Sequence, residues 1–432
     1  MAGGSDRRRD LVKARIGAAL SLAIDNSGTE ALNALDEIAD GFDTGDDEIV
    51  ARFHQAGAIA EIKARNVAAG FAAFDSSIAA ARRHGEPLML AKILNNYSTA
   101  AIQDGSSGDA VRYAREALQL FRGESSGVPI GLVTLSEALY DAAQLEECGD
   151  VLREFYSIQR SDATTEQAVT HDELLEIAAV SVPVGLFLSD AELLGESSPM
   201  LVNLAFSRVA DRFLGPIAEA FCALYELQND RAKHDELVLR AATSIRTLDQ
   251  SLPFAVRVAR TGPPELLPRF ASLVAQQCGA GSKLMGAFSD LFQTAASMRR
   301  NVPKAAQEAG PRAAAAFAAT GRPLLQAAAE EAFGQVERAR EIRRGCGART
   351  DAAHQRWWGE RVKKNLGTAL SAREMEVARL VAKGETYKEI AQVLDLSERT
   401  VHRHCESIFG KLGIRSRWQV AAALAPDAAP IG

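Results

Sequence analysis

Apolar residues recur at three- and four-residue spacing along residues 10–335, the pattern typical of helices that bury one face. No convincing run alternates apolar and polar positions as a half-buried strand would. Clusters of Gly, Pro, Ser and Asn interrupt the pattern. These predicted breaks lie at 26–28, 41–46, 85–87, 105–108, 123–129, 196–199, 262–264 and 321–323. We therefore expect an all-α fold of helices and helical hairpins.

One stretch indicates that the helical part repeats. The residues from Leu94 to Tyr97 start one helix, Gly105 closes it, and the segment from Gly108 to Leu118 begins the next. Small and large apolar residues at these offsets resemble a tetratricopeptide repeat, in which small residues let paired helices approach. Related patterns precede and follow at spacings near 40 residues. We favour degenerate helical-hairpin repeats for residues 30–160, with a non-repeating bundle as the alternative.

Charge is distributed unevenly along the 432 residues, a length that predicts two or three domains. The whole chain carries 49 Lys and Arg against 56 Asp and Glu, a net charge of −7. Residues 337–432 carry 18 basic and 12 acidic residues, so their net charge is +6 and that of the remainder is −13. A basic C-terminal quarter on an acidic body is typical of a tethered nucleic-acid-binding module, and a solvated Arg-rich linker is the alternative.

Several classes of protein find no support in the sequence. The five cysteines form no CxxC pair and the seven histidines form no HExxH, so we expect reduced thiols, no metal and no cofactor. The charged start at Arg7 to Arg9 and the apolar run at 16–24 lack a clear cleavage site, so we expect a first amphipathic helix. The longest other apolar stretch, 178–188, is far shorter than the ~20 residues that a bilayer requires. These features predict a cytoplasmic protein without a membrane segment.

The strongest signal lies between Leu370 and Leu424, where helix caps predict four consecutive helices. Capping boxes at 371–374, 386–389 and 416–419 mark three helix starts, because each hydroxyl and each Glu or Gln satisfies an unpaired N–H group. Ser397 caps a further helix, which runs to about Leu412. The central pair, a short helix, a tight turn and a longer helix, has helix-turn-helix dimensions.

The third of these helices has one apolar and one polar face. Its apolar stripe consists of Val401, Cys405, Ile408 and Leu412. His402, Arg403 and Glu406 lie on the opposite face at 100° per residue, and a helix entering the major groove would present them to base edges. Arg403 can donate to guanine, Glu406 can accept from cytosine, and His402 can do either. The residues placed to contact phosphates are Thr386, Lys388, Arg399, Thr400, Lys411, Arg415 and Arg417.

This segment closely resembles the LuxR-type helix-turn-helix domain of bacterial transcription regulators. The matching residues are Leu370 to Glu374, Gly384, Lys388 to Ala391, Leu396 to Val401, His404, Ile408 and Lys411 to Arg417. The resemblance implies that the residues after Val401 probe the major groove and that the fourth helix supports dimerisation. His402 departs from the family pattern, which usually has lysine there, and Glu406 stands where polar or basic residues are common.

A weaker resemblance extends upstream. Residues 320–325 and the Ala-rich helix after them look like the helical region that precedes the DNA-binding domain in large actinobacterial LuxR regulators. Those regulators carry an N-terminal nucleotide-binding domain, whereas this sequence has no GxxxxGK[ST] phosphate loop. We expect a helical, tetratricopeptide-like sensor or interaction region at 1–335, a basic linker at 336–369 with Trp357 and Trp358, and the DNA-binding domain at 370–425.

These observations predict a sequence-specific DNA-binding transcription regulator that binds double-stranded DNA as a homodimer. The helical body would bind a protein or small-molecule effector. The alternative is a helical-repeat adaptor whose main role is protein binding, with the basic domain as a non-specific DNA tether. We do not expect an enzyme, because the scattered Asp, Glu and His residues form no nucleophile–base pattern.

Overall fold

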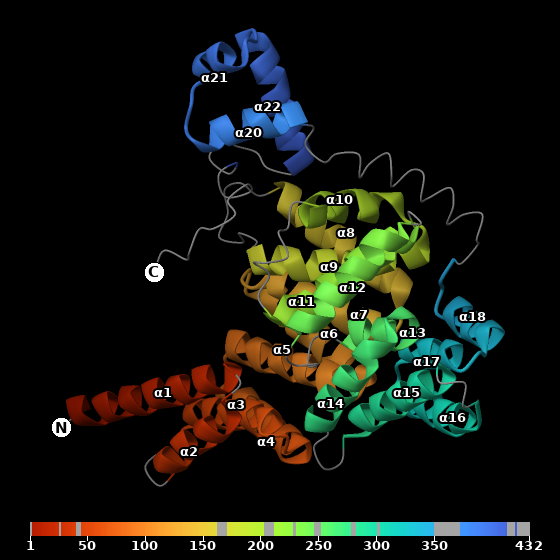
Figure 1. Ribbon diagram of the computed structural model, residues 1–432. Coiled ribbons are helices and arrows are strands. Elements are labelled where there is room, and N and C mark those ends of the chain that lie inside the picture. The colour runs from red at the N-terminus through yellow and green to blue at the C-terminus, as the bar shows by residue number, and fades with distance from the viewer. Residues whose placement is uncertain are drawn as a thin grey trace. The chain divides into compact units, whose positions relative to one another are not determined.

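The computed structural model describes residues 2–25, 27–39, 45–161, 171–202, 211–227, 230–245, 252–277, 282–299, 303–349, 372–412 and 420. Every regular element among these residues is helical, which confirms the predicted all-α class (Figure 1). The chain divides into two compact units, one formed by Met1–Val169 with Arg246–Ala348, the other by Thr170–Ile245 with Arg349–Gly432.

The first unit is built from the N-terminal helices and a later group. Its helices are α1 (Ala2–Ile24), α2 (Gly28–Ala39), α3 (Asp47–Lys63), α4 (Val67–His84), α5 (Pro87–Asp104), α6 (Ser107–Gly123), α7 (Val128–Asp141), α8 (Leu145–Ser161), α13 (Leu252–Thr261), η2 (Pro264–Leu266), α14 (Leu267–Gln277), α15 (Lys283–Arg299), α16 (Pro303–Ala319), α17 (Pro323–Ala332) and α18 (Val336–Gly345). The second unit contains α9 (His171–Leu188), α10 (Ala191–Val202), α11 (Asp211–Leu227), α12 (Arg231–Ser244), α20 (Ala372–Ala382), α21 (Tyr387–Leu394) and α22 (Glu398–Leu412).

Most predicted breaks separate two helices, but two predictions about helix ends are wrong. The helix α10 continues through 196–199, where Ser197 donates a 2.8 Å hydrogen bond to the carbonyl of Leu193 instead of ending the helix. The helix α5 begins at Pro87 rather than at Leu94, because proline is favoured in the first turn, where its missing N–H costs nothing. The predicted linker begins with α18, and Trp357 and Trp358 lie outside the described residues.

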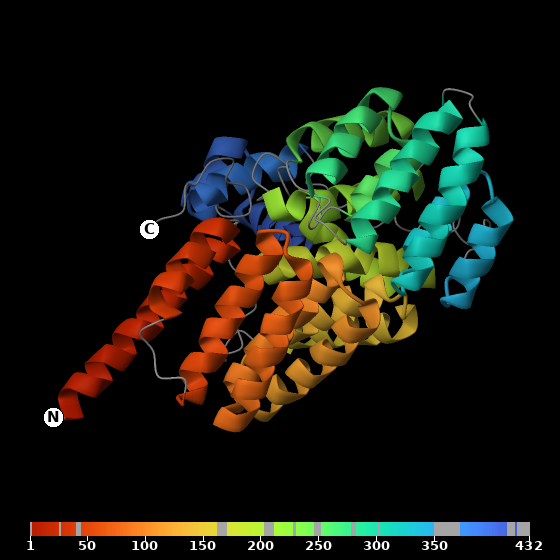
Figure 2. The same cartoon turned by 90° about the horizontal axis from the view of Figure 1, so that it is seen from below.

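Three consecutive helix pairs, α3 with α4, α5 with α6 and α7 with α8, follow one another along the first unit (Figure 2). Their first helices begin at Asp47, Pro87 and Val128, about 40 residues apart. This interval agrees with the spacing read from the sequence. The tetratricopeptide character of the pairs stays a prediction.

Within each pair, a small buried side chain bonds to the backbone of the facing helix. Ser77 of α4 donates to the carbonyl of Ala51 at 2.7 Å, and Ser98 of α5 donates to the carbonyl of Ala110 at 2.9 Å. In the third pair, the thiol of Cys148 lies 3.3 Å from a carbonyl oxygen of α7, to which it donates. Only short side chains allow such contacts, so the small residues bring the paired backbones close together.

A buried arginine joins two segments of the first unit that lie far apart in the sequence. Arg322, just before α17, has a fully buried side chain. Its guanidinium donates to the carbonyl oxygens of Ala101, Ile102 and Gly105 at 3.1, 2.7 and 3.0 Å, at the C-terminal end of α5. It also donates to a carboxylate oxygen of Asp141 at 3.0 Å. A positive charge at a helix C-terminus is favourable, and the carboxylate supplies the counter-charge.

The loop that carries this arginine is held by a second contact. The hydroxyl of Ser107 donates to the carbonyl of Gly321 at 2.7 Å. Gly321 has a φ of 74°, a left-handed conformation that glycine adopts without strain.

Burial raises the pKa of Asp141 to about 6 although Arg322 opposes the shift. Removal of the guanidinium would therefore leave a buried carboxylate without its counter-charge.

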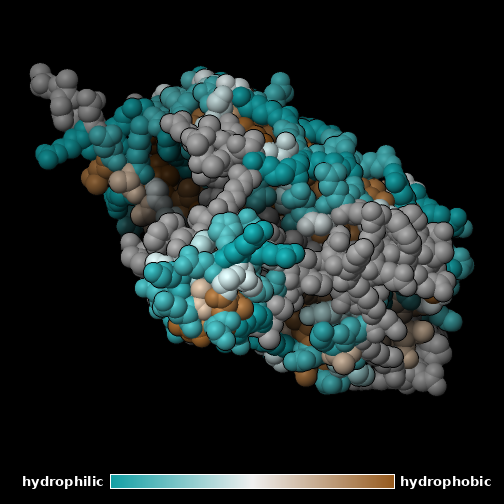
Figure 3. Space-filling model, turned by 90° about the horizontal axis from the view of Figure 1, so that it is seen from above, coloured by the Kyte–Doolittle hydropathy of each residue, from teal (hydrophilic) through white to brown (hydrophobic). Residues whose placement is uncertain are grey.

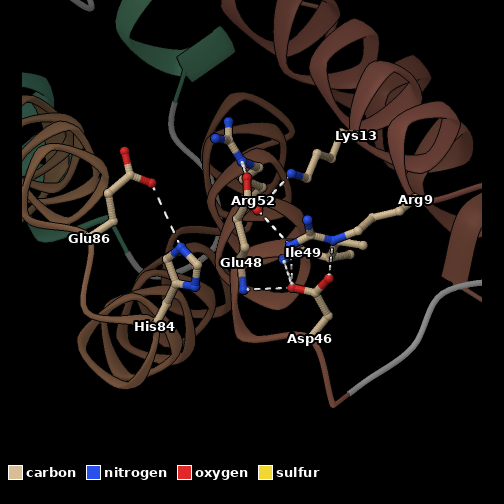
Figure 4. Close-up of polar contacts among 8 residues, drawn as sticks. All are labelled: Arg9, Lys13, Asp46, Glu48, Ile49, Arg52, His84 and Glu86. Carbon is tan, nitrogen blue, oxygen red and sulfur yellow. Dashed lines mark hydrogen bonds and ion pairs between the residues drawn. The ribbon is translucent and has the colours of Figure 1, made fainter. Parts of the chain in front are cut away.

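Charged side chains tie α1 to the start of α3 (Figure 4). Arg9 of α1 lies 2.6 Å from Asp46, which also caps α3 by accepting from the backbone N–H groups of Glu48 and Ile49. Lys13 of α1 lies 2.6 Å from the Glu48 carboxylate. The hydrogen bond from Arg9 lowers the pKa of Asp46 against the effect of burial. Burial raises the pKa of Glu48, but its basic neighbours outweigh this effect and the net shift is downward.

The exposed large apolar side chains among the described residues are spread over several helices. They include Leu11 and Ile24 of α1, Leu239 of α12 and Val393 of α21. Most of the coloured atoms in Figure 3 belong to hydrophilic residues, with small hydrophobic patches between them. None of the helices in the described ranges is long and apolar enough to cross a bilayer.

Replacement of Arg322 by alanine should lower the free energy of unfolding by about 3–5 kcal/mol, because it strands the Asp141 carboxylate and several carbonyl groups. Urea unfolding of the full chain measures the change. Arg338→Ala is the control, since the ion pair of Arg338 with Glu341 is exposed and its loss should cost less than about 1 kcal/mol. Equal losses in the two variants would contradict the structural role of Arg322.

Acidification should loosen α1. Carboxylates whose pKa is lowered in the folded protein stabilise it above their ordinary pKa and lose this effect as the pH falls. Hydrogen-exchange protection of α1, corrected for intrinsic rates, should therefore fall between about pH 5 and pH 3. Glu48→Gln should remove on the order of 1–2 kcal/mol of protection at pH 7 and flatten this pH dependence. Glu37→Gln, in an exposed pair with Arg15, should behave like the wild type.

Candidate nucleic-acid interface

The predicted caps define the described part of the C-terminal segment. The hydroxyl of Thr386 accepts from the backbone N–H of Glu389 at 3.3 Å, and the Glu389 carboxylate accepts from the N–H of Thr386 at 2.7 Å. This capping box begins α21, as predicted. Asp395, in the left-handed region with a φ of 52°, makes the turn, and Ser397 then accepts from the N–H of Thr400 at 3.1 Å to begin α22.

The apolar faces of the three helices meet in a small core. Its buried residues are Val377, Ala378, Val381, Ile390, Ala391, Val401, Cys405, Ile408 and Val420. The predicted stripe of α22 supplies Val401, Cys405 and Ile408, none more than 1% exposed. The stripe therefore sets the rotation of α22 about its own axis, and Cys405 packs in the core as predicted.

Two polar contacts hold α20 against the other helices. The buried carboxylate of Glu374 accepts a 2.7 Å hydrogen bond from the hydroxyl of Ser407 in α22. Arg373 donates to the carbonyl of Leu394 at the end of α21. The sequence assigned Glu374 to a capping box with Ser371, which lies outside the described residues. The box at 416–419 and most of the predicted fourth helix also lie outside them.

The opposite face of α22 is open to solvent and carries the three predicted base-reading residues. The side chains of His402 and Glu406 are 58% and 68% exposed, and Arg403 is exposed as well. These residues line an open depression together with Tyr387, Glu398 and Arg399. The structure thus brings the three predicted readers together on one accessible surface.

Two side chains constrain the imidazole of His402. Its Nδ1 atom lies 3.5 Å from a carboxylate oxygen of Glu406, one turn further along α22. On its other side, the ring centroid of Tyr387 lies 5.5 Å away, with the two ring planes at 84°. Sequence reasoning missed Tyr387, because it stands in the first turn of α21 and only the packing of α21 against α22 brings its ring to His402.

The structure describes only some of the residues predicted to contact phosphates. Thr386, Lys388 and Arg399 are exposed, and Thr400 is half-buried. The hydroxyls of Thr400 and Ser397 lie 2.7 Å apart at the start of α22. Lys411 lies in the last turn of α22 with its side chain outside the description, and Arg415 and Arg417 lie outside the described residues.

Comparison with known proteins identifies this segment. Residues 368–424 match the family described as bacterial regulatory proteins, luxR family. The spore germination protein GerE of Bacillus subtilis is 42% identical over 55 residues, which are 13% of this chain and 74% of GerE. The chain belongs to the LuxR family.

Other relatives are much longer than their region of similarity. A protein of Mycobacterium tuberculosis named as an HTH-type transcriptional regulator is 31% identical over 175 residues, 39% of this chain. The match spans only 18% of that protein's length. The protein YhjB of Escherichia coli, also named as an HTH-type transcriptional regulator, is 41% identical over 56 residues, 13% of this chain and 28% of YhjB.

The described residues hold no group of three or more His, Cys, Asp or Glu side chains arranged to bind a metal ion. The open face of α22 carries groups that can form hydrogen bonds and ion pairs. Arg403 and Arg399 donate, the carboxylates of Glu398 and Glu406 accept, and the imidazole of His402 does either according to its protonation.

Loss of the capping hydroxyl should weaken α21. Thr386→Ala should cost about 0.5–2 kcal/mol, because the N–H of Glu389 loses its acceptor. Hydrogen exchange at the α21 amides of the full chain measures this local stability. Thr386→Ser keeps the hydroxyl and serves as the control. If alanine and serine gave the same protection, the capping box would not contribute to the stability of α21.

Proposed function

We propose that the chain is a sequence-specific DNA-binding transcription regulator in which α22 lies in the major groove of double-stranded DNA. The orientation of α22 carries this proposal. Its apolar stripe is buried in the three-helix core, and its polar face, with His402, Arg403 and Glu406, is accessible. A major groove about 12 Å wide admits one helix, and the N-terminal half of such a helix meets the base edges first.

The three exposed side chains have distinct roles in this proposal. Arg403 donates two hydrogen bonds to the O6 and N7 atoms of a guanine, the geometry that suits a guanidinium. Glu406 accepts from an amino group on a base. His402 donates or accepts according to its tautomer.

Backbone contacts would set the register of α22 on the duplex without reading sequence. The side chains assigned to them are Thr386, Lys388, Arg399, Thr400, Lys411, Arg415 and Arg417. The exposed positions of Lys388 and Arg399 support this assignment. The N-terminus of α21 adds backbone N–H groups, which attract phosphate oxygens.

The organisation proposed for the whole chain follows the sequence. Residues 1–335 form a helical region that binds a protein or small-molecule effector, 336–369 form a basic linker, and 370–425 bind DNA. A homodimer would read two half-sites one helical turn apart, since a single short helix covers few base pairs. The net charge of +6 on the C-terminal quarter supports the assignment of DNA binding to this part of the chain.

A second candidate function is that of a protein-binding adaptor with a non-specific DNA tether. The three successive helix pairs between Asp47 and Ser161 favour it, because stacked helical hairpins form extended surfaces for protein partners. The two candidates differ in one measurable property. A regulator discriminates between DNA sequences, whereas a tether binds all duplexes alike.

Replacement of Arg403 by alanine should weaken binding to a selected duplex by about 1–3 kcal/mol and relax discrimination at one base pair. The full chain is first used to enrich binding sites from random duplexes, and affinity is then measured by fluorescence anisotropy. We expect a dissociation constant of about 10⁻⁸ M or tighter for the best site, weakening steeply with salt.

Lys388→Ala provides the contrast to this variant. If Lys388 contacts a phosphate, this variant should bind all duplexes more weakly by nearly the same factor. The slope of log affinity against log salt should decrease in magnitude by about 1. Equal binding of the wild-type chain to enriched and scrambled duplexes at every salt concentration would refute sequence-specific reading and support the adaptor.

A further inference from the structure

Tyr387, His402 and Glu406 form a continuous array on the open face of α22. The Tyr387 ring meets the imidazole of His402 edge to face, and that imidazole lies 3.5 Å from the Glu406 carboxylate. The two exposed side chains of α22 are therefore restricted from both ends, by α21 and by each other. Such restriction lowers the entropy lost when the side chains meet a ligand.

The charges around the array nearly cancel. The depression contains the carboxylates of Glu398 and Glu406 and the guanidinium groups of Arg399 and Arg403, while α21 contributes the phenol of Tyr387. Two negative and two positive groups leave the depression close to neutral overall, so hydrogen-bond donors and acceptors decide which base it fits.

The chemistry of a carboxylate restricts what Glu406 can read. An ionised carboxylate only accepts hydrogen bonds. In the major groove, cytosine presents the N4 amino group and adenine the N6 amino group, whereas guanine O6 and thymine O4 are acceptors that a carboxylate repels. A carboxylate at this position therefore favours bases with an exocyclic amino group.

We propose that the Tyr387–His402–Glu406 array determines specificity at one base pair, by presenting the Glu406 carboxylate to an exocyclic amino group. Glu406 is the specificity-determining residue, and His402 and Tyr387 are positioning residues. This inference rests on the proposed major-groove binding of α22.

The test uses the full-length chain and the best duplex that the wild type enriches from a random pool. Each position of that duplex is changed to all four base pairs, and affinity is measured at pH 7.5. Glu406→Gln should reduce the preference for cytosine or adenine at one position by about tenfold. The four-base panel shows whether cytosine N4 or adenine N6 is the group that Glu406 selects.

The positioning role of Tyr387 is tested with two matched variants. Tyr387→Phe keeps the ring and should keep the preference. Tyr387→Leu removes the aromatic contact and should reduce the preference at the same position about threefold, with other positions unchanged. Thermal unfolding of both variants checks that α21 remains folded. Equal preferences in Tyr387→Leu and the wild type would overturn the role of Tyr387.

The role of His402 is tested at the same base pair. His402→Ala removes the imidazole beside the Glu406 carboxylate and should lower the preference at the Glu406 position, as Tyr387→Leu does. An unchanged preference in Glu406→Gln would overturn the array. Failure of the wild type to enrich any duplex would instead refute the proposed function itself, so the two failures are distinguishable.

Discussion

Burial of one narrow stripe of α22 is the constraint on which the recognition surface depends. Val401, Cys405 and Ile408 are almost inaccessible, and each occupies a position one turn from the next. Withdrawing these side chains from water stabilises one rotation of the helix over all others. The polar residues between them are then forced outward. The polar residues of α22 are thus accessible because the stripe is buried, and no contact made by the polar side chains themselves is required.

The helices of the first unit pack against one another in a different way. Its paired helices approach through small residues, with a buried hydroxyl or thiol bonding to the facing backbone in each of the three pairs. These pairs are local in sequence. Arg322 supplies the long-range link, since it joins the start of α17 to the ends of α5 and α7. The loop at 320–323, which the sequence marked as a helix break and as part of a weak family resemblance, acquires a further structural role through that contact.

Helix ends that depend on neighbouring residues could be predicted from the sequence, whereas helix ends imposed by tertiary packing were missed. Glycine and proline clusters and capping boxes act within a few residues, so they can be recognised in a single sequence. The helices α3, α7 and α9 end instead near Arg65, Ala143 and Ser189, non-glycine residues in the left-handed region, with φ of 71°, 55° and 57°. Residues of these types do not usually adopt this conformation, so surrounding packing must impose it.

The same distinction applies to the recognition surface. Helical periodicity alone placed His402, Arg403 and Glu406 on the outward face of α22, because the stripe and the polar face belong to one helix. Tyr387 belongs to another helix, and its position beside His402 depends on how α21 packs on α22. The bonds of Arg322 to residues more than 180 positions away were beyond any local pattern for the same reason.

A carboxylate on a DNA-reading face weakens attraction to phosphates, and the chain as a whole is acidic, with a net charge of −7. Both features lower the affinity for arbitrary DNA, which arises almost entirely from phosphate contacts. Specificity is a difference between affinities, so repulsion from wrong sites improves it as effectively as attraction to the right one. A genome offers millions of competing sites, on the order of 10⁶ or more. Under that competition, a reading face whose opposite charges nearly cancel favours discrimination over tight binding.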